Sequence, residues 1–205
     1  MFALVPAAGH STRMGRPKLA LPLGASTVLE CAVTALRAGG VKRVLVVTGP
    51  HVPELAPLAR QAGATVLELP QPTPDMRTTI ERGLDWAECA WQPGAGEAFL
   101  LCPADHPALD PGVLRALIQA RGDRPLSIVI PTFNGQRGHP ALIAWPHVAG
   151  IRALPPGAGL NRYLREHAAQ TLEVPVDSGS VLLDLDTPAD YERLRAGWQI
   201  QAPHR

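Results

Sequence analysis

The sequence of 205 residues has no marked excess of either charge and no long apolar run. Its formal net charge is +1, whereas a nucleic-acid surface would need a clustered excess of basic residues. No apolar stretch approaches the roughly 18 residues that a membrane-spanning helix needs, and no basic segment precedes an apolar core at the N-terminus. We therefore expect no nucleic-acid partner, no membrane partner and no signal peptide.

Cysteine is scarce, and Cys31, Cys89 and Cys102 are too far apart to form a metal-ligand motif. Isolated thiols are typical of a reducing compartment, so the sequence predicts a cytoplasmic protein. No Ser/His/Asp or Cys/His arrangement indicates a covalent nucleophile. The length and the 46% hydrophobic content fit one domain with a sizeable core, or at most a domain with a small extension.

Two common nucleotide-binding motifs are also missing, G-x-x-x-x-G-K-[ST] and G-x-G-x-x-G. A different loop, Pro6–Lys18, follows the first apolar run and reads P-A-A-G-H-S-T-R-M-G-R-P-K. Its small residues Ala7, Ala8 and Gly9 would let an anion approach successive backbone N–H groups. Arg13 and Lys18 add two cations, as a polyphosphate requires. The alternative is a surface loop with a few cations, but the combination favours phosphate binding.

The rest of the chain alternates between expected strands and helices. Continuous apolar runs predict buried strands, and caps, glycines and helical spacing predict the helices. The strands are expected at 2–6, 44–47, 65–69, 98–102, 126–131, 141–144, 171–175 and 181–185, and the helices at 26–38, 52–62, 77–90, 110–120, 160–168 and from 187. This order predicts an α/β fold with one Rossmann-like, doubly wound, mostly parallel sheet. Ligands bind beyond the carboxyl ends of such strands, where the opening loop would lie.

Asp105 follows the most apolar of these strands, 98–102, at the same expected edge of the sheet. An isolated aspartate between a strand and a helix is most often a helix cap. Asp110, directly before Pro111, is better placed for that role and leaves Asp105 available. A carboxylate that faces a polyphosphate loop suits Mg²⁺, which takes one or two protein carboxylates together with phosphate oxygens.

Asp184 and Asp186 are a second acidic feature, two positions apart on the expected strand 181–185. Both side chains would then point to one face and repel each other unless a positive group lies between them. A metal ion would supply that charge. The alternative is that Asp186 or Thr187 only caps the helix opened by Pro188.

Gly135–Pro140, G-Q-R-G-H-P, places His139 where a strand is expected to begin. A lone histidine is more often structural, but the flanking Gly138 and Pro140 favour a shaped pocket for an acceptor. His10 and His106 flank the loop and Asp105 and could contact phosphate, and we assign neither a catalytic role.

Taken together, these motifs resemble those of the nucleotidyltransferases that act on the molybdenum cofactor. That family belongs to a larger group of pyrophosphorylases with a GT-A-like, Rossmann-type fold. Four matching stretches occur in order along nearly the whole chain, with a weaker one at Met76–Leu84: Pro6–Lys18, Asp105–Pro107, Gly135–Pro140 and Asp184–Pro188.

The resemblance implies transfer of a nucleoside monophosphate from CTP or GTP to molybdopterin, with Mg²⁺ or alternatively Mn²⁺, and a recipient molybdoenzyme as a partner. It implies a single domain, 1–205, with nucleotide binding mainly in 1–110 and acceptor binding mainly in 111–195. The implied catalytic residues are Arg13, Lys18 and Asp105, and the implied metal ligands are Asp105, Asp184 and Asp186. The implied nucleotide-binding residues are Pro6, Ala7, Ala8, Gly9, Ser11, Arg13, Lys18, Thr78, Pro103 and Asp105, and the acceptor-binding residues are Gly138, His139 and Pro140.

Ala8 bears on the choice of base. Guanylyl-transferring relatives have glycine there, and the Ala-Ala-Gly version resembles the cytidylyl-transferring members. A methyl group there would narrow the slot for the base and favour a pyrimidine, so we expect CTP.

Alternative functions are another cytidylyl or sugar-phosphate nucleotidyltransferase, or a non-catalytic nucleotide- or cofactor-binding chaperone. The isoprenoid-pathway enzyme carries H-D-A-A-R where this chain has Ala104–Pro107, and Arg13, Lys18 and Asp105 count against a chaperone.

Overall fold

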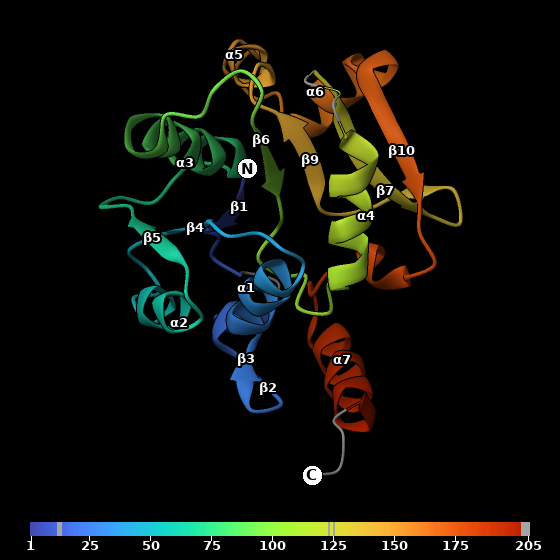
Figure 1. Cartoon of the computed structure of the whole chain (residues 1–205). Helices are drawn as coiled ribbons and strands as arrows, with labels where there is room; N and C mark the ends of the chain where they lie inside the picture. The colour runs from blue at the N-terminus through green and yellow to red at the C-terminus, as the bar shows by residue number, and fades with distance from the viewer. Residues whose placement is uncertain (12–13, 123, 125, 202–205) are drawn as a thin grey trace.

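The computed structural model describes residues 1–11, 14–122, 124 and 126–201. One central sheet crosses the molecule, and its strands follow one another from side to side in Figure 1. Their order is β10 (Thr171–Pro175), β7 (Ile128–Phe133), β9 (Ala141–Ala144), β6 (Ala98–Leu101), β1 (Phe2–Ala7), β4 (Val44–Thr48) and β5 (Thr65–Glu68). A short strand β8 (Gln136–Arg137) also pairs with β7. β9 runs antiparallel to both neighbours and the β5–β4–β1–β6 pairs are parallel, which confirms the mostly parallel sheet.

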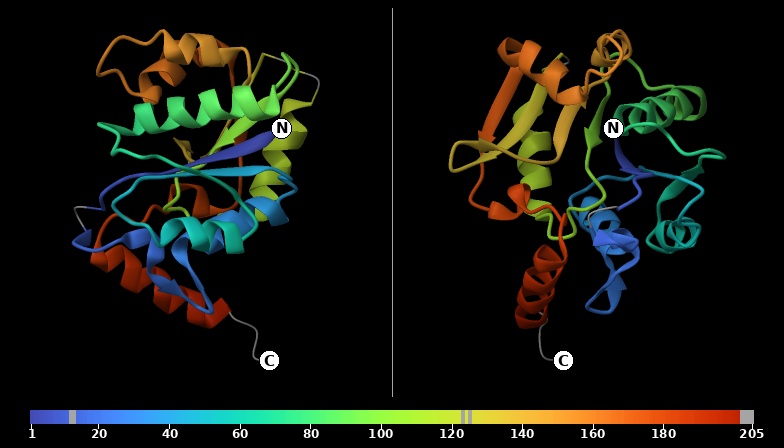
Figure 2. Two further views of the ribbon diagram at one scale, coloured as in Figure 1. Left: turned by 90° about the vertical axis from the view of Figure 1, so that its left-hand side faces the viewer. Right: turned by 180° about the vertical axis from the view of Figure 1, so that it is seen from behind.

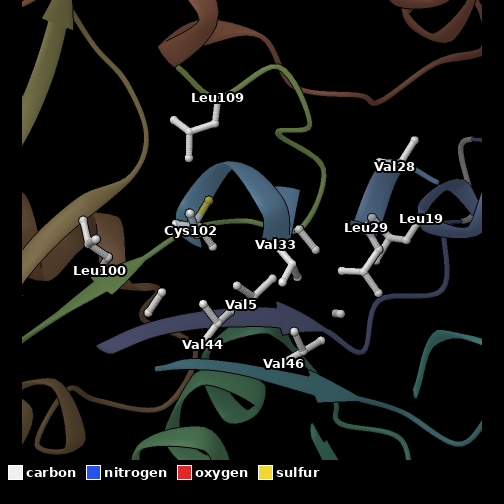
Figure 3. Close-up of a cluster of buried hydrophobic side chains, with 14 of the residues drawn as sticks. Val5, Leu19, Val28, Leu29, Val33, Val44, Val46, Leu100, Cys102 and Leu109 are labelled. Carbon is white, nitrogen blue, oxygen red and sulfur yellow. The ribbon is translucent and has the colours of Figure 1, made fainter. Parts of the chain in front are cut away.

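Helices cover both faces of the sheet, because side chains of each strand alternate between the faces. Helices α1 (Val28–Ala38), α2 (Leu55–Gln61) and α4 (Pro111–Arg121) pack on one face, and α3 (Met76–Trp91), α5 (His147–Arg152) and α6 (Leu160–Glu166) on the other (Figure 2). Figure 3 shows part of the first layer, where Val5 and Val46 of the sheet lie beneath Val33 of α1. Each fully buried side chain of this kind stabilises the fold by roughly 1.5–3 kcal/mol.

Two helix starts, those of α1 and α4, have side-chain caps, and the cap of α4 is the expected Asp110. Thr27 accepts a hydrogen bond from the N–H of Glu30 at 3.4 Å, and the Glu30 carboxylate accepts one from the N–H of Thr27 at 2.8 Å. This capping box begins α1 at Val28, and the residues before it form the hairpin of β2 (Pro22–Leu23) and β3 (Ser26–Thr27). Asp110 accepts from the N–H of Gly112 at 2.7 Å and so caps α4.

The prediction of a strand at 181–185 is wrong. The chain forms a 3-10 turn there, η4 (Gly179–Leu182), in which Ser178 Oγ accepts from the N–H of Ser180. The N–H of Leu183 donates to the carbonyl of Ser180 at 3.2 Å and closes the turn, and the carbonyl of Val181 accepts from the N–H of the distant His139 at 2.8 Å. Thr187 and not Asp186 starts α7 (Pro188–Gln201), since its Oγ1 accepts from the N–H of Asp190 at 3.2 Å.

The six-residue helix α5 was not expected, because so short a segment shows little helical periodicity. Further short 3-10 turns are η2 (Lys18–Ala20) and η3 (Ala168–Gln170). Within the described ranges, no helix combines the length and apolar character needed to cross a membrane.

Candidate active site

The opening loop and Asp105 leave the sheet at the same edge. β1 and β6 are parallel neighbours, with Phe2 opposite Phe99 and Leu4 opposite Leu101. The N–H of Cys102 extends this pairing by donating to the carbonyl of Leu4 at 3.1 Å. The segments that follow the two strands therefore emerge side by side at the carboxyl edge, where α/β sheets bind ligands.

Lys18 is the centre of the cluster at this edge. Its Nζ donates to Asp105 Oδ2 at 2.6 Å, to the carbonyl of Leu185 at 2.7 Å and to Asp186 Oδ1 at 3.2 Å. An ammonium group has three N–H donors, so the three acceptors match it fully. The Lys18 side chain is only 16% exposed, and Asp105 is 18% exposed. The side chain of Lys18 is thus a positive group between Asp105 and Asp186, and the predicted metal ion between Asp184 and Asp186 stays a prediction.

Asp184 and Asp186 lie on an irregular segment and have different surroundings. The N–H of Leu185 donates to the carbonyl of Asp105 at 3.1 Å and holds this segment against the loop after β6. Asp186 contacts Lys18, whereas Asp184 is exposed and lines, together with Asp105, a cavity of about 360 Å³. The premise that both lie on one face of a strand is therefore wrong, although both remain beside Asp105.

These carboxylates fit a divalent cation that also binds a nucleotide. In the described part of the chain, no three His, Cys, Asp or Glu side chains gather into a full ligand set. Asp105 and Asp186 nevertheless converge on the same ammonium group. One or two carboxylates completed by phosphate oxygens and water is the ligand set that Mg²⁺ commonly takes in nucleotide enzymes.

The first half of the opening loop is well packed. Pro6, Ala7 and Ala8 are buried, and Gly9 is exposed at the edge of the sheet. Ser11 has a φ of +51°, and its Oγ accepts from the backbone N–H of Lys18 at 3.4 Å. This bond ties the two ends of the loop together. Arg13, predicted as a catalytic and nucleotide-binding residue, lies outside the described residues.

His51 belongs to this region and was missed in the sequence. Its Nε2 lies 3.1 Å from the carbonyl oxygen of Gly9, and its ring stacks on that of His10 with centroids 3.9 Å apart. The one signal that could have found it is its position just after β4, the parallel neighbour of β1. The carboxyl end of β4 thus contributes a side chain that holds the opening loop.

Thr78 and Pro103, the other predicted nucleotide-binding residues, have different structural surroundings. The N–H and Oγ1 of Thr78 donate to Asp75 Oδ1 at 2.7 and 2.8 Å, which caps α3. These hydrogen bonds hold the pKa of the Asp75 carboxyl below its usual range. Pro103 is half-buried between β6 and Asp105. Nucleotide contact by either residue stays a prediction.

The predicted acceptor motif packs against η4. Gly138 donates its N–H to the carbonyl of Pro131 at 2.9 Å. A Cβ atom at Gly138 would lie 2.5 Å from the carbonyl oxygen of Val181, so only glycine fits this close approach. His139 follows with its own hydrogen bond to Val181, and Pro140 is buried. The motif therefore fixes the position of η4.

His139 and His106 form a largely buried pair behind Asp105. Their ring centroids are 5.0 Å apart, and Nε2 of His106 lies 3.9 Å from Asp105 Oδ1. Each Nδ1 is buried and has no hydrogen-bond partner among the described residues. Burial lowers the pKa of His106 from its ordinary value, and burial together with His106 lowers the pKa of His139 to about 4. Both rings are therefore neutral near pH 7, and they back Asp105 without adding charge.

The free energy of unfolding is expected to fall as the pH drops from about 6.5 towards about 4. In this window the unfolded chain protonates His139, whose ordinary pKa is 6.5, while the folded protein does not. The stabilisation is complete above pH 6.5 and is lost as the pH approaches 4. Urea unfolding at a series of pH values would measure it. His139→Gln should reduce the slope, and His10→Gln, at an exposed histidine, should not; equal slopes in all three proteins would contradict the assignment.

Comparison with known proteins identifies the family. The model of the family described as the MobA-like NTP transferase domain matches residues 3–171, most of the chain. The chain belongs to this family. The MobA-like NTP transferases are enzymes, and relatives carry the names of cytidylyl- and guanylyltransferases, so this protein is a nucleotidyltransferase.

Two curated relatives match nearly end to end. One, 32% identical over 98% of this chain and 96% of its own length, is the phosphoenolpyruvate guanylyltransferase of Rubrobacter xylanophilus. Another, 26% identical over 92% of both chains, is the molybdenum cofactor cytidylyltransferase of Escherichia coli K12. They differ in the nucleotide and in the acceptor that their names state.

Two solved structures superpose on this chain over nearly its whole length and share its fold. A nucleotidyl transferase from Methanothermobacter thermautotrophicus superposes with a TM-score of 0.79, at 24% identity over 97% of each chain. Rv0371c of Mycobacterium tuberculosis H37Rv, in a complex with manganese, superposes with a TM-score of 0.74. It is 25% identical and covers 95% of this chain and 97% of its own.

Proposed function

We propose that this MobA-like transferase moves CMP from CTP to the terminal phosphate of molybdopterin and releases pyrophosphate. The observation that carries the transfer chemistry is the Lys18 cluster, in which one ammonium holds Asp105 and Asp186 beside the opening loop. The nucleotide lies mainly on residues 1–110 and the acceptor mainly on 111–195 of a single domain.

The chain's own groups position the reactants and balance their charge. The backbone of Ala7–Gly9 binds the triphosphate at the carboxyl edge of β1, where successive N–H groups can meet phosphate oxygens. Lys18 binds the same phosphates and offsets the charge of the leaving pyrophosphate. The acceptor phosphate is already anionic and needs no general base. Holding both reactants in line accounts for much of the rate.

A divalent metal ion, Mg²⁺ or Mn²⁺, fits beside these groups. Asp105 would hold it together with Asp184 or Asp186, as the convergence of the carboxylates and the manganese complex of the M. tuberculosis relative support. When bound, such an ion neutralises charge on the phosphates. Lys18 would keep the carboxylates in place until it exchanges one of them for phosphate.

GMP transfer is the second candidate, because the relative with 32% identity is named a guanylyltransferase with phosphoenolpyruvate as its acceptor. A direct test offers purified protein CTP or GTP, each with molybdopterin or phosphoenolpyruvate, and measures pyrophosphate release. We expect turnover with CTP and molybdopterin. Clear preference for GTP would overturn the base assignment, and turnover only with phosphoenolpyruvate would overturn the acceptor.

Ala8→Gly is expected to raise the GTP-to-CTP ratio of kcat/KM by about 10-fold, equivalent to about 1.4 kcal/mol. The methyl group of Ala8 is buried where β1 ends, 3.4 Å from the place where a Cβ would lie at Gly49 of the next strand's loop. Removing it widens this edge at a cost in stability of about 1 kcal/mol. Ala104→Gly, at another buried alanine of the same edge, is the matched control and should leave the ratio unchanged. An unaltered ratio in Ala8→Gly would show that Ala8 does not select the base.

A further inference from the structure

The segment that follows β4 lies against the opening loop. β4 pairs in parallel with β1 on the side opposite to β6, so the segments after β1 and β4 leave the sheet at the same edge (Figure 1). A Cβ atom at Gly49 would lie 3.4 Å from the Cβ of Ala8, which shows how closely the two segments pack. His51 is the side chain that reaches from this segment to the opening loop.

The backbone around His51 is anchored on both sides. Before it, the carbonyl of Thr48 accepts from the N–H of Leu69 at 2.9 Å. After it, Val52 is buried, and its carbonyl accepts from the N–H of Leu55 at 3.2 Å where α2 begins. The ring of His51 therefore extends from a fixed support.

His51 holds the opening loop at two points. Its Nε2 lies 3.1 Å from the carbonyl oxygen of Gly9, and its ring stacks on that of His10 with centroids 3.9 Å apart and 21° between the planes. A carbonyl oxygen can only accept a hydrogen bond, so Nε2 carries the hydrogen and donates it. The orientation of the peptide group between Gly9 and His10 is thereby fixed.

The fold places this ring at a cost. Nδ1 of His51 is buried and has no hydrogen-bond partner among the described residues. A Cβ atom at Gly49 would lie 2.7 Å from Cε1 and 2.9 Å from Nδ1 of the ring, so the ring fits only beside a glycine. An unpaired buried nitrogen destabilises a protein, and such departures from good packing concentrate at functional sites. His51 therefore has features of a functional side chain.

The hydrogen bond to Gly9 also sets the direction of the next N–H group. The peptide between Gly9 and His10 is trans, and in a trans peptide the C=O and the N–H point in opposite directions. Because the Gly9 carbonyl turns towards the segment after β4, the His10 N–H points away from that segment. Asp105, which contacts Lys18, follows the neighbour of β1 on the other side. No described residue accepts a hydrogen bond from the His10 N–H, so it can bind an anion.

We propose that His51 is a positioning residue of the nucleotide site. By holding the Gly9 carbonyl, it aims the His10 N–H at the polyphosphate chain of the nucleotide. The assignment rests on the proposed nucleotidyl transfer and adds a residue to the site of its first substrate. His51 acts through the backbone of the opening loop, so its contribution is to polyphosphate affinity and is independent of the base.

Binding of inorganic tripolyphosphate, measured by calorimetry at one fixed Mg²⁺ concentration, tests the role of His51. His51→Leu should bind about 5- to 10-fold more weakly, as expected when the hydrogen bond that orients the loop is lost. His51→Gln has an amide N–H that can donate to the same carbonyl, so its affinity should stay within about two-fold of wild type. Wild-type affinity in His51→Leu, or equal weakening in His51→Gln, would overturn the assignment.

His167→Leu is the matched control. Nδ1 of His167 lies 2.9 Å from the carbonyl oxygen of Tyr163, and its ring stacks on that of Tyr163 with centroids 3.8 Å apart at 21°. His167 precedes the start of β10 and so lies at the amino edge of the sheet, opposite the candidate site. This variant should lower the thermal unfolding midpoint without changing tripolyphosphate affinity. Equal weakening in His167→Leu and His51→Leu would show a merely structural effect and overturn the proposal.

Gly49→Ala provides a second test that keeps the histidine. The added methyl group must displace the His51 ring, so tripolyphosphate should bind more weakly than to wild-type protein. This variant decides the question if His51→Leu does not fold. Wild-type affinity in a folded Gly49→Ala protein whose ring has lost its contact with Gly9, as shown by the His51 side-chain NMR signals, would count against the proposal.

Kinetics separate the role of His51 from the proposed reaction. In His51→Leu the KM for CTP should rise by the same factor, while kcat and the KM for molybdopterin stay unchanged. If the variants change tripolyphosphate affinity as expected but wild-type protein transfers no CMP, the reaction is wrong and the role of His51 stands. If CMP transfer proceeds and His51→Leu binds tripolyphosphate like wild type, the reaction stands and the role of His51 is wrong. Wild-type protein that does not bind tripolyphosphate would refute the role of His51.

Discussion

Asp105→Ala is expected to lower kcat of the nucleotidyl transfer by about 1000-fold while the protein remains folded. Asp105 contacts Lys18 at 2.6 Å and also lines the cavity of about 360 Å³ beside α7. The variant loses the carboxylate best placed to hold a metal ion beside the phosphates. Lys18 keeps two of its acceptors, the carbonyl of Leu185 and Asp186, so the loss in stability should be about 1 kcal/mol.

Steady-state kinetics with CTP and molybdopterin, together with thermal unfolding, would measure both effects. Asp85→Ala is the control, because Asp85 is a 53% exposed carboxylate on α3 that pairs with Arg152 away from the site. It should keep wild-type kcat. Wild-type turnover in Asp105→Ala would refute the role of this carboxylate in the reaction.

Lys18→Met is expected to lower kcat/KM for CTP by about 1000-fold, the second of the two largest effects. Methionine has a similar length but no charge, so the variant removes the ammonium that we expect to meet the leaving pyrophosphate. It also leaves Asp105 and Asp186 without their shared cation. Because these carboxylates are largely but not fully buried, the cost in stability should be roughly 1–3 kcal/mol, between that of an exposed and that of a buried ion pair.

Lys42→Met is a natural control, since Lys42 is the only other lysine of the sequence and is exposed in the segment before β4. It should be kinetically silent. Raising the Mg²⁺ concentration should restore only part of the activity of Lys18→Met, because a metal ion can replace the charge but not the position of Nζ. A Lys18→Met enzyme with unchanged kcat/KM would exclude Lys18 from phosphate binding.

Most elements could be read from the sequence because their signals are local. A capping box acts over three residues, a proline after Asp110 starts a helix, and a continuous apolar run is buried on both faces of a sheet. The same local logic separated Asp110, a helix cap, from Asp105, which contacts Lys18. It failed at 181–185, where apolar residues in alternation with aspartates favoured a strand. There the N–H of Leu183 donates to the carbonyl of Ser180 at 3.2 Å, and the segment is a 3-10 turn instead.

The candidate active site depends on contacts between distant segments, and for these the sequence has no local signal. Lys18 meets Asp105, 87 positions away, because parallel pairing of β1 and β6 brings their loops to one edge. It meets Asp186, 168 positions away, because the segment before α7 returns to the same edge. A cavity of about 1150 Å³ likewise forms only where α1, η4 and α7 come together. Motifs along the chain could therefore identify the family and candidate site residues, whereas packing alone placed an ammonium between Asp105 and Asp186.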